Sequence, residues 1–286
     1  KQVPVERHAL AVSRLPTLAG RARDTLNEAL SLAGTDEGLA LLWGIGLGRL
    51  LEELLAGSKF QVVVVERDAD KVRAWRERLA AAGLDGSRAA ILPGEPLELG
   101  LPPYWARLIV AEEEPRQDLE RIMDFVFRTL RPYGSAALLP MPSENLEHVK
   151  NTAVLARIPG LDIRPRGEVL VFRREGPLSG SADYQGAKNF DDLVRAPLRL
   201  LWFGDNYHHH KLFYRGFLPE TGRGLPPTIR VAGGLMKYEI PRQAHGAQPQ
   251  GVKYLDYLAQ ISAKEHDDVF VDVYTGQSAP ARLWRE

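Results

Sequence analysis

The segment LALLWGIGLGRLLEELL (Leu39–Leu55), with the run QVVVVERD (Gln61–Asp68) that follows it, decides the fold of this chain. A strand-length apolar run leads into three glycines at alternate positions, Gly44, Gly46 and Gly48, and a helical pattern comes next. Because glycine lacks a Cβ, such a turn can bend sharply or approach a ligand closely. The helix after it points its free N–H groups at the turn. We therefore predict a strand–turn–helix–strand unit that binds a nucleoside.

An acid at the end of the second apolar run supports this prediction. Glu66 lies about 20 residues beyond the glycine turn, where dinucleotide-type folds place the acid that binds ribose hydroxyls. The same glycines would also serve a sheet that binds nothing, since they allow a strand and a helix to pack closely. The sequence leaves both interpretations open.

Strand and helix patterns alternate over the first part of the chain. Helical patterns cover residues 7–33, 47–56, 69–82, 118–130 and 145–156, and strand patterns cover residues 39–43, 61–65, 89–92, 106–114, 135–140 and two pieces of 163–173. Such alternation is typical of right-handed β-α-β units. The predicted fold class is therefore α/β, a Rossmann-like, doubly wound, mostly parallel sheet with residues 39–43 beside 61–65 at its centre.

The pattern changes after Gly176, where GPLSGSADYQG (residues 176–186) is typical of a linker. Beyond it the apolar runs are short, at residues 198–204, 228–240 and 268–276, with one helical pattern at 252–263. We expect two parts, a Rossmann domain over residues 1–175 and an irregular β-rich extension over residues 176–286.

Composition limits the classes of partner. The chain carries 37 basic and 37 acidic residues, which argues against a large nucleic-acid surface. No apolar run reaches the roughly 18 residues that span a bilayer. With no cysteine, disulfides and thiolate chemistry are excluded. The chain starts at Lys1, so we expect a piece of a longer or processed product.

At this point residues 1–175 resemble class I S-adenosylmethionine-dependent methyltransferases. Five motifs of that family occur in order and at matching spacing. They are the glycine motif LWGIGLG (residues 42–48), the ribose acid Glu66, the adenine-contacting PGEP (93–96), the acidic strand end AEEE (111–114) and the turn LRPYG (130–134). The resemblance implies S-adenosylmethionine as the cofactor.

The resemblance also implies a set of cofactor-binding residues. They are Gly44, Ile45, Gly46, Gly48, Glu66, Arg67, Glu95 and Glu112. Glu95 would accept from the adenine amino group, or is a plain loop acid. One of Glu112, Glu113 and Glu114 would contact substrate or act as a base, and the others are solvated. No catalytic residue is assigned, because methyl transfer depends chiefly on holding the donor in line with the nucleophile.

Two positions depart from the family pattern. Leu42 stands where active members commonly have an acid that orients the methionine ammonium, and Leu47 stands where Asp, Ser or Thr is frequent. We expect both leucines to weaken the methionine end of the site and to leave the ribose and adenine end intact. Trp43, before the first glycine, is expected in the core, with stacking on a ligand as the alternative.

The second part resembles PQQ-type β-propeller repeats. RAPLRLLWFGD (residues 195–205) and VFVDVYTGQSAPARLWRE (269–286) look like pieces of such blades. In planctomycete proteins a methyltransferase-like domain lies beside or within a propeller, and this chain is similar to that composite. The resemblance implies partners in the rest of a propeller protein or in other subunits, because one blade cannot bury its own face.

The run HHH (His208–His210) raises a metal hypothesis, with His245 as a further ligand. A metal site needs three or four converging ligands, and the sequence has no motif with metal-ligand spacing, such as H-E-x-x-H, near these histidines. Surface or hydrogen-bonded histidines are the interpretation we adopt, so no metal site is predicted.

Two functions from different classes remain. The first is an S-adenosylmethionine-dependent methyltransferase with an unassigned acceptor, and the second is a non-catalytic methyltransferase-like scaffold within a larger propeller protein. An active methyltransferase implies a cytoplasmic location, and a PQQ-type propeller implies a periplasmic one.

Overall fold

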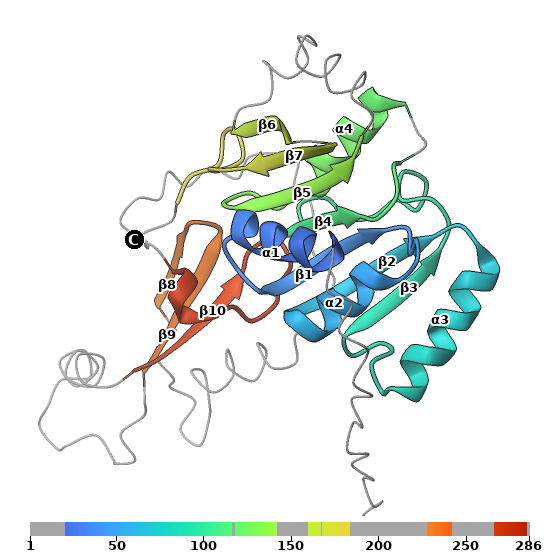
Figure 1. The fold of residues 1–286 in the computed structure, drawn as a ribbon. Helices are drawn as coiled ribbons and strands as arrows, with labels where there is room; N and C mark the ends of the chain where they lie inside the picture. Colours follow the sequence, from blue (N-terminus) through green and yellow to red (C-terminus); the bar gives the residue numbers. More distant parts are fainter. Residues whose placement is uncertain are drawn as a thin grey trace, which may run out of the picture. The chain divides into compact units, whose positions relative to one another are not determined.

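The computed structural model describes residues 21–115, 118–141, 160–166, 168–183, 228–241 and 266–284 (Figure 1). The chain divides into two compact units, Lys1–Gly176 and Pro177–Glu286.

The first unit is built on a seven-stranded sheet in the order β3-β2-β1-β4-β5-β7-β6. The strands are β1 (Glu37–Trp43), β2 (Lys59–Glu66), β3 (Ala89–Pro93), β4 (Leu108–Ala111), β5 (Ser135–Pro140), β6 (Leu161–Arg166) and β7 (Val169–Arg174). The first five run parallel, and β7 is antiparallel to both of its neighbours. The sequence prediction of a mostly parallel α/β sheet is confirmed.

The pairing of β1 with β2 is the one that the sequence predicted. The two strands are parallel neighbours, with Leu39 opposite Gln61 and Trp43 opposite Val65. Both strands are strongly apolar and lie inside the sheet with a strand on each side, as expected for parallel strands covered on both faces.

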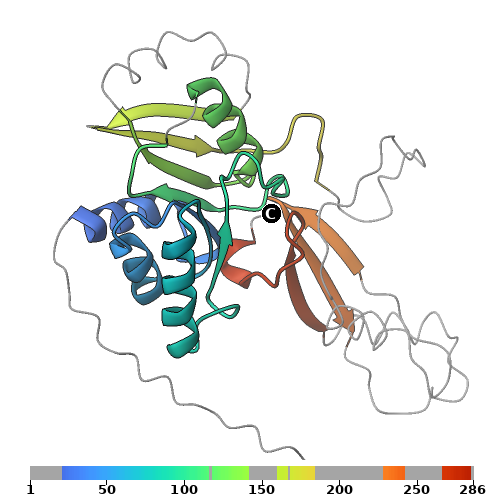
Figure 2. The same ribbon diagram turned by 90° about the vertical axis from the view of Figure 1, so that its right-hand side faces the viewer.

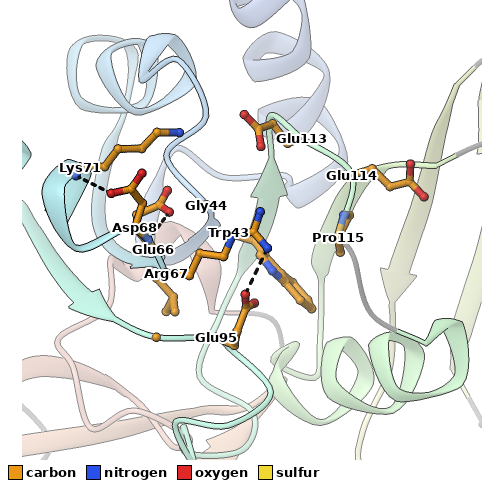
Figure 3. Close-up of a pocket in the computed structure, with 12 residues that line it drawn as sticks. Trp43, Gly44, Glu66, Arg67, Asp68, Lys71, Glu95, Glu113, Glu114 and Pro115 are labelled. Carbon is orange, nitrogen blue, oxygen red and sulfur yellow. Dashed lines mark hydrogen bonds and ion pairs between the residues drawn. The ribbon is translucent and has the colours of Figure 1, made fainter.

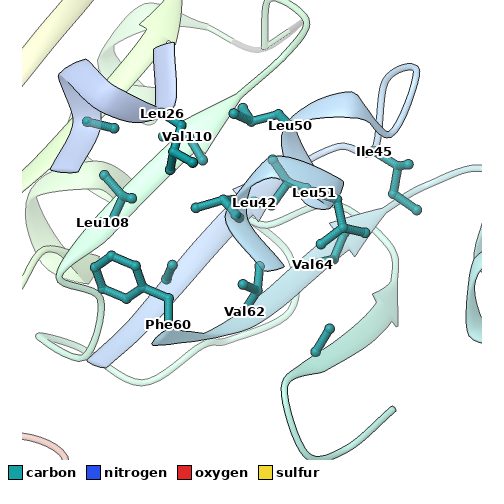
Figure 4. Packing of buried hydrophobic residues seen from close by; sticks show 14 of the residues in the cluster. Leu26, Leu42, Ile45, Leu50, Leu51, Phe60, Val62, Val64, Leu108 and Val110 are labelled. Carbon is teal, nitrogen blue, oxygen red and sulfur yellow. The ribbon is translucent and has the colours of Figure 1, made fainter. Parts of the chain in front are cut away.

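Helices cover both faces of this sheet (Figures 1 and 2). They are α1 (Arg21–Ala33), α2 (Arg49–Gly57), α3 (Ala69–Ala81) and α4 (Leu119–Thr129). Apolar residues of α1, α2 and α3 pack with Leu42, Val64 and Val110 in one core, which we call the α2-side core (Figure 4). Residues of α4 pack with Leu41 and Trp43 in a second core on the other face.

Helix α2 begins at Arg49, two residues later than the sequence predicted. The cause is the backbone of the turn, since Gly46 (φ 58°) and Gly48 (φ 80°) adopt left-handed conformations. Such φ values are incompatible with a right-handed helix. Leu47 and Gly48, the first two residues of the predicted helix, therefore lie in the turn. The helix also includes Gly57, which was expected just beyond its end.

The described part of the second unit is a three-stranded antiparallel sheet in the order β10-β9-β8. Its strands are β8 (Thr228–Ala232), β9 (Leu235–Pro241) and β10 (His266–Asp272). Gly233 and Gly234 join β8 to β9, both with positive φ, which suits a tight two-residue hairpin turn. The predicted run at residues 198–204 and the predicted helices at 145–156 and 252–263 lie outside the described residues.

Among the residues that the structure describes, no helix combines the length and the apolar character that crossing a membrane requires.

Candidate functional site

A pocket opens where the strand order of the sheet reverses. From β1 the chain crosses to β2 on one side, whereas β4 leads to β5 on the other. Loops at the carboxyl ends of β1 and β4 therefore diverge, and open α/β sheets bind ligands in the crevice between them. The pocket there has a volume of about 130 Å³ (Figure 3). It is lined by Trp43, Gly44, Val65, Glu66, Arg67, Asp68, Lys71, Gly94, Glu95, Glu113, Glu114 and Pro115.

The three glycines of the turn have three different surroundings. A Cβ added to Gly44 would meet no atom within 4 Å, whereas one on Gly46 would lie 2.5 Å from Oε2 of Glu112. One on Gly48 would lie 2.0 Å from the ring of Trp75. Only Gly44 among them lines the pocket. Gly46 and Gly48 thus serve internal packing, and Gly44 is the position where a ligand can approach the backbone.

Glu66 ends β2 with its side chain buried at the base of the pocket. It is 5% exposed. Its Oε2 accepts from the N–H of Ile45 at 2.7 Å, and its Oε1 accepts from the N–H of Asp68 at 2.9 Å. These bonds tie the glycine turn to the start of the next loop. A carboxylate has about four acceptor positions, so both oxygens keep capacity for the hydroxyls of a ligand.

Glu112 follows β4 and binds the same turn from the other side. Its Oε2 accepts from the N–H of Leu47 at 2.8 Å, and its Oε1 accepts from the N–H of Leu50. The N-cap residue of α2 is Gly48, which has no side chain to cap the helix. Glu112 supplies that cap, a carboxylate at the positive end of the helix dipole.

The pocket is rich in acids. Five of its lining residues are carboxylates and two are basic, a formal balance of −3 (two minus five). Both basic groups are already engaged. Arg67 lies 3.9 Å from Glu95, and Nζ of Lys71 donates to the carbonyl of Gly46 at 3.0 Å. The charge of the pocket therefore favours a neutral or cationic ligand over a phosphate.

Asp68 forms the rim of the pocket and caps α3. Its carboxylate accepts from the N–H groups of Lys71 and Asp70, and these bonds hold the pKa of Asp68 below its ordinary value of 3.8. Because the folded-state pKa is lowered, its stabilisation is complete above 3.8 and is lost as pH falls through the folded-state pKa.

A pH titration of unfolding tests this role of Asp68. Asn offers a similar capping oxygen to Asp, but it does not titrate and carries no negative charge to interact with the positive end of the helix dipole. We expect wild type to be more stable to urea than Asp68→Asn at pH 6, with the difference shrinking as pH falls below 3.8. A difference that stays constant down to pH 3 would contradict the assignment.

The structure brings half of the sequence-predicted residues to the pocket. Gly44, Glu66, Arg67 and Glu95 line it. The other four, Ile45, Gly46, Gly48 and Glu112, shape the turn instead, and the side chain of Ile45 is fully buried in the α2-side core. Trp43 is both core and pocket wall: it is 6% exposed and meets Phe125 edge to face.

Sequence reasoning missed Lys71. Its signal was present, because Lys71 lies in the first turn of the helix that follows Glu66 and so stands near the carboxyl edge of the sheet. Gly94, in the loop after β3, lines the pocket beside Glu95 and was quoted only as part of the adenine motif.

The expectation for Leu42 and Leu47 is wrong in its geometry. Leu42 is fully buried in the α2-side core, under the helix rather than in the pocket. Leu47 is 77% exposed and points to solvent. Neither leucine lines the pocket, so neither places an apolar side chain against a ligand there.

His208–His210 and His245 lie outside the described residues. Within the described ranges, no group of three or more His, Asp or Glu side chains is arranged to hold a metal ion.

A scan against protein-family models and a search of curated proteins found no match. Solved structures with a similar fold include methyltransferases. A candidate S-adenosyl-L-methionine-dependent methyltransferase from Methanococcus maripaludis is 16% identical, over 54% of this chain and 84% of that one, with a TM-score of 0.45. A tRNA methyltransferase from Aquifex aeolicus is 19% identical, over 56% of this chain and 70% of that one, with a TM-score of 0.40. A methyltransferase from Geobacter sulfurreducens is 19% identical, over 54% of this chain and 80% of that one, with a TM-score of 0.40.

Proposed function

We propose that the first unit binds a nucleoside cofactor of the S-adenosylmethionine type and uses it for methyl transfer. The observation that carries this proposal is the buried Glu66 in a pocket at the point where the strand order reverses. Its carboxylate is fixed by two backbone N–H groups and keeps acceptor capacity toward the pocket. A pair of ribose hydroxyls is the ligand group that suits a fixed carboxylate in this place.

The remaining pocket residues fit the other parts of such a cofactor. Gly44 leaves its backbone open to a close approach, and Glu95 stands in the loop after β3, where the resemblance places the adenine. A sulfonium nucleoside carries positive charge, and the acid-rich lining complements that charge. When bound, the cofactor would supply an activated methyl group, and this chain's residues would hold and orient it.

Calorimetric titration with S-adenosylhomocysteine and adenosine tests the proposal, with Glu66→Ala as the first variant. We expect both ligands to bind wild type and Glu66→Ala to lose about 1–3 kcal/mol of binding, the usual effect of losing a charged hydrogen-bond partner. Glu66→Gln keeps one acceptor oxygen but no charge, so its affinity for both ligands should lie between those of wild type and Glu66→Ala.

Glu98→Ala is the matched control, an exposed acid in the same loop as Glu95 that does not line the pocket. It should leave affinity unchanged. Equal affinities for wild type, Glu66→Ala and Glu98→Ala would remove Glu66 from the site, and no binding by wild type would end the cofactor proposal.

The alternative is a scaffold within a PQQ-type β-propeller protein, and the second unit supplies its supporting observation. Its β8–β10 sheet is an antiparallel meander, the building plan of propeller blades. The carboxylate of Asp272 accepts from the N–H groups of Tyr274 and Thr275 in the VYTG turn, and Phe270 packs on Trp284 at 5.7 Å. Absence of binding in the titration above would favour this alternative.

A further inference from the structure

The N–H groups at the N terminus of α2 already have a hydrogen-bond partner within the chain, the carboxylate of Glu112. In dinucleotide-type folds this helix end binds a pyrophosphate, because its free N–H groups and its dipole attract an anion. In this chain the N–H of Leu50, in the first turn of α2, donates to Glu112, as does the N–H of Leu47 just before the helix. The chain therefore provides the anion itself.

The fit between Glu112 and the turn is close. A Cβ on Gly46 would lie 2.5 Å from Oε2 and 2.8 Å from Cβ of Glu112. The carboxylate thus occupies the space over Gly46, and it does so with a negative charge. A phosphate at this place would have to displace Glu112 and remain beside it, and two like charges a few ångströms apart repel strongly near a protein surface.

The two residues after Glu112 add further negative charge. Glu113 and Glu114 line the pocket. The loop after β4 therefore places one acid on the glycine turn and two more in the wall of the pocket. The two basic groups of the pocket offset these acids only in part. Arg67 is paired with Glu95, and Lys71 keeps its charge while it donates to the carbonyl of Gly46, so the lining retains its formal balance of −3.

From these contacts we propose that Glu112 is a specificity-determining residue. It fills the anion position at the start of α2, so the site accepts nucleosides that are neutral or cationic beyond the ribose and rejects those with a 5′-phosphate. This inference rests on the proposed nucleoside site and names its ligand class, excluding nucleotides and dinucleotides.

Paired titrations with adenosine and adenosine 5′-monophosphate test the proposal. Wild type should bind adenosine at least about tenfold more tightly than the monophosphate, and Glu112→Ala should reduce that preference by about tenfold. Glu112→Gln keeps a capping oxygen without the charge and should also reduce it. Glu53→Ala, which removes the same charge further along α2, should leave the preference unchanged.

A preference for the monophosphate in wild type would overturn the proposal, as would equal changes in Glu112→Ala and Glu53→Ala. Amide hydrogen exchange separates this failure from failure of the nucleoside site. Exchange at Leu47 and Leu50 should be faster in Glu112→Ala than in wild type and should slow again with inorganic phosphate. That result supports the proposal even if no nucleoside binds, and unchanged exchange at both amides contradicts it.

Discussion

Leu42→Asp is expected to destabilise the first unit by about 4 kcal/mol or more, or to prevent its folding. The substitution introduces the acid that the methyltransferase-like sequence pattern would place at this position. In the structure Leu42 is fully buried among apolar residues beneath α2 (Figure 4). A carboxylate there would lose its water without gaining a partner. Urea unfolding followed by circular dichroism measures the effect.

Two further variants keep this prediction testable if Leu42→Asp does not fold. Leu42→Ala should cost about 2–5 kcal/mol, the usual effect of emptying a buried leucine site. Leu47→Asp is the matched control, because Leu47 is 77% exposed, and it should change stability by less than about 0.5 kcal/mol. A stable Leu42→Asp variant that binds S-adenosylhomocysteine more tightly would show that Leu42 faces the ligand.

Gly48→Ala has the second large expected effect, a loss of about 2–4 kcal/mol in unfolding free energy. Two causes add. Gly48 has φ 80°, a left-handed conformation that L residues adopt at a cost, and the new Cβ would lie 2.0 Å from the ring of Trp75. Trp75 also stacks with the guanidinium of Arg78, so its ring cannot shift without losing that contact.

Gly44→Ala separates the two causes. Gly44 has φ 76° but no atom within 4 Å of the added Cβ, so only the backbone cost of about 1–2 kcal/mol applies. Removing the ring in a Trp75→Leu background should bring the cost of Gly48→Ala close to that of Gly44→Ala. Equal costs for both glycines in the wild-type background would mean that Trp75 does not pack against the turn.

The sequence of the first unit predicted its sheet well because the decisive signals are local. Apolar runs bounded by glycines, with helical periods between them, indicated the strands, and the β1–β2 pairing followed from the right-handed β-α-β rule. The boundaries shifted where φ decided them, as at the start of α2. The glycine turn and Glu66 lie at the ends of two adjacent strands, as their spacing in the chain predicts.

Tertiary structure decided the roles of individual side chains. Strand β1 is apolar on both faces, so its sequence carries no alternation to say which way Leu42 points, and only packing against α2 settles it. Glu112 lies far along the chain from Leu47 and Leu50, and no local pattern predicts that its carboxylate caps their helix. The sequence by itself determined a mostly parallel α/β sheet, since fold follows from periodicity, whereas the contacts between distant loops decided which residues line the pocket and which hold the turn.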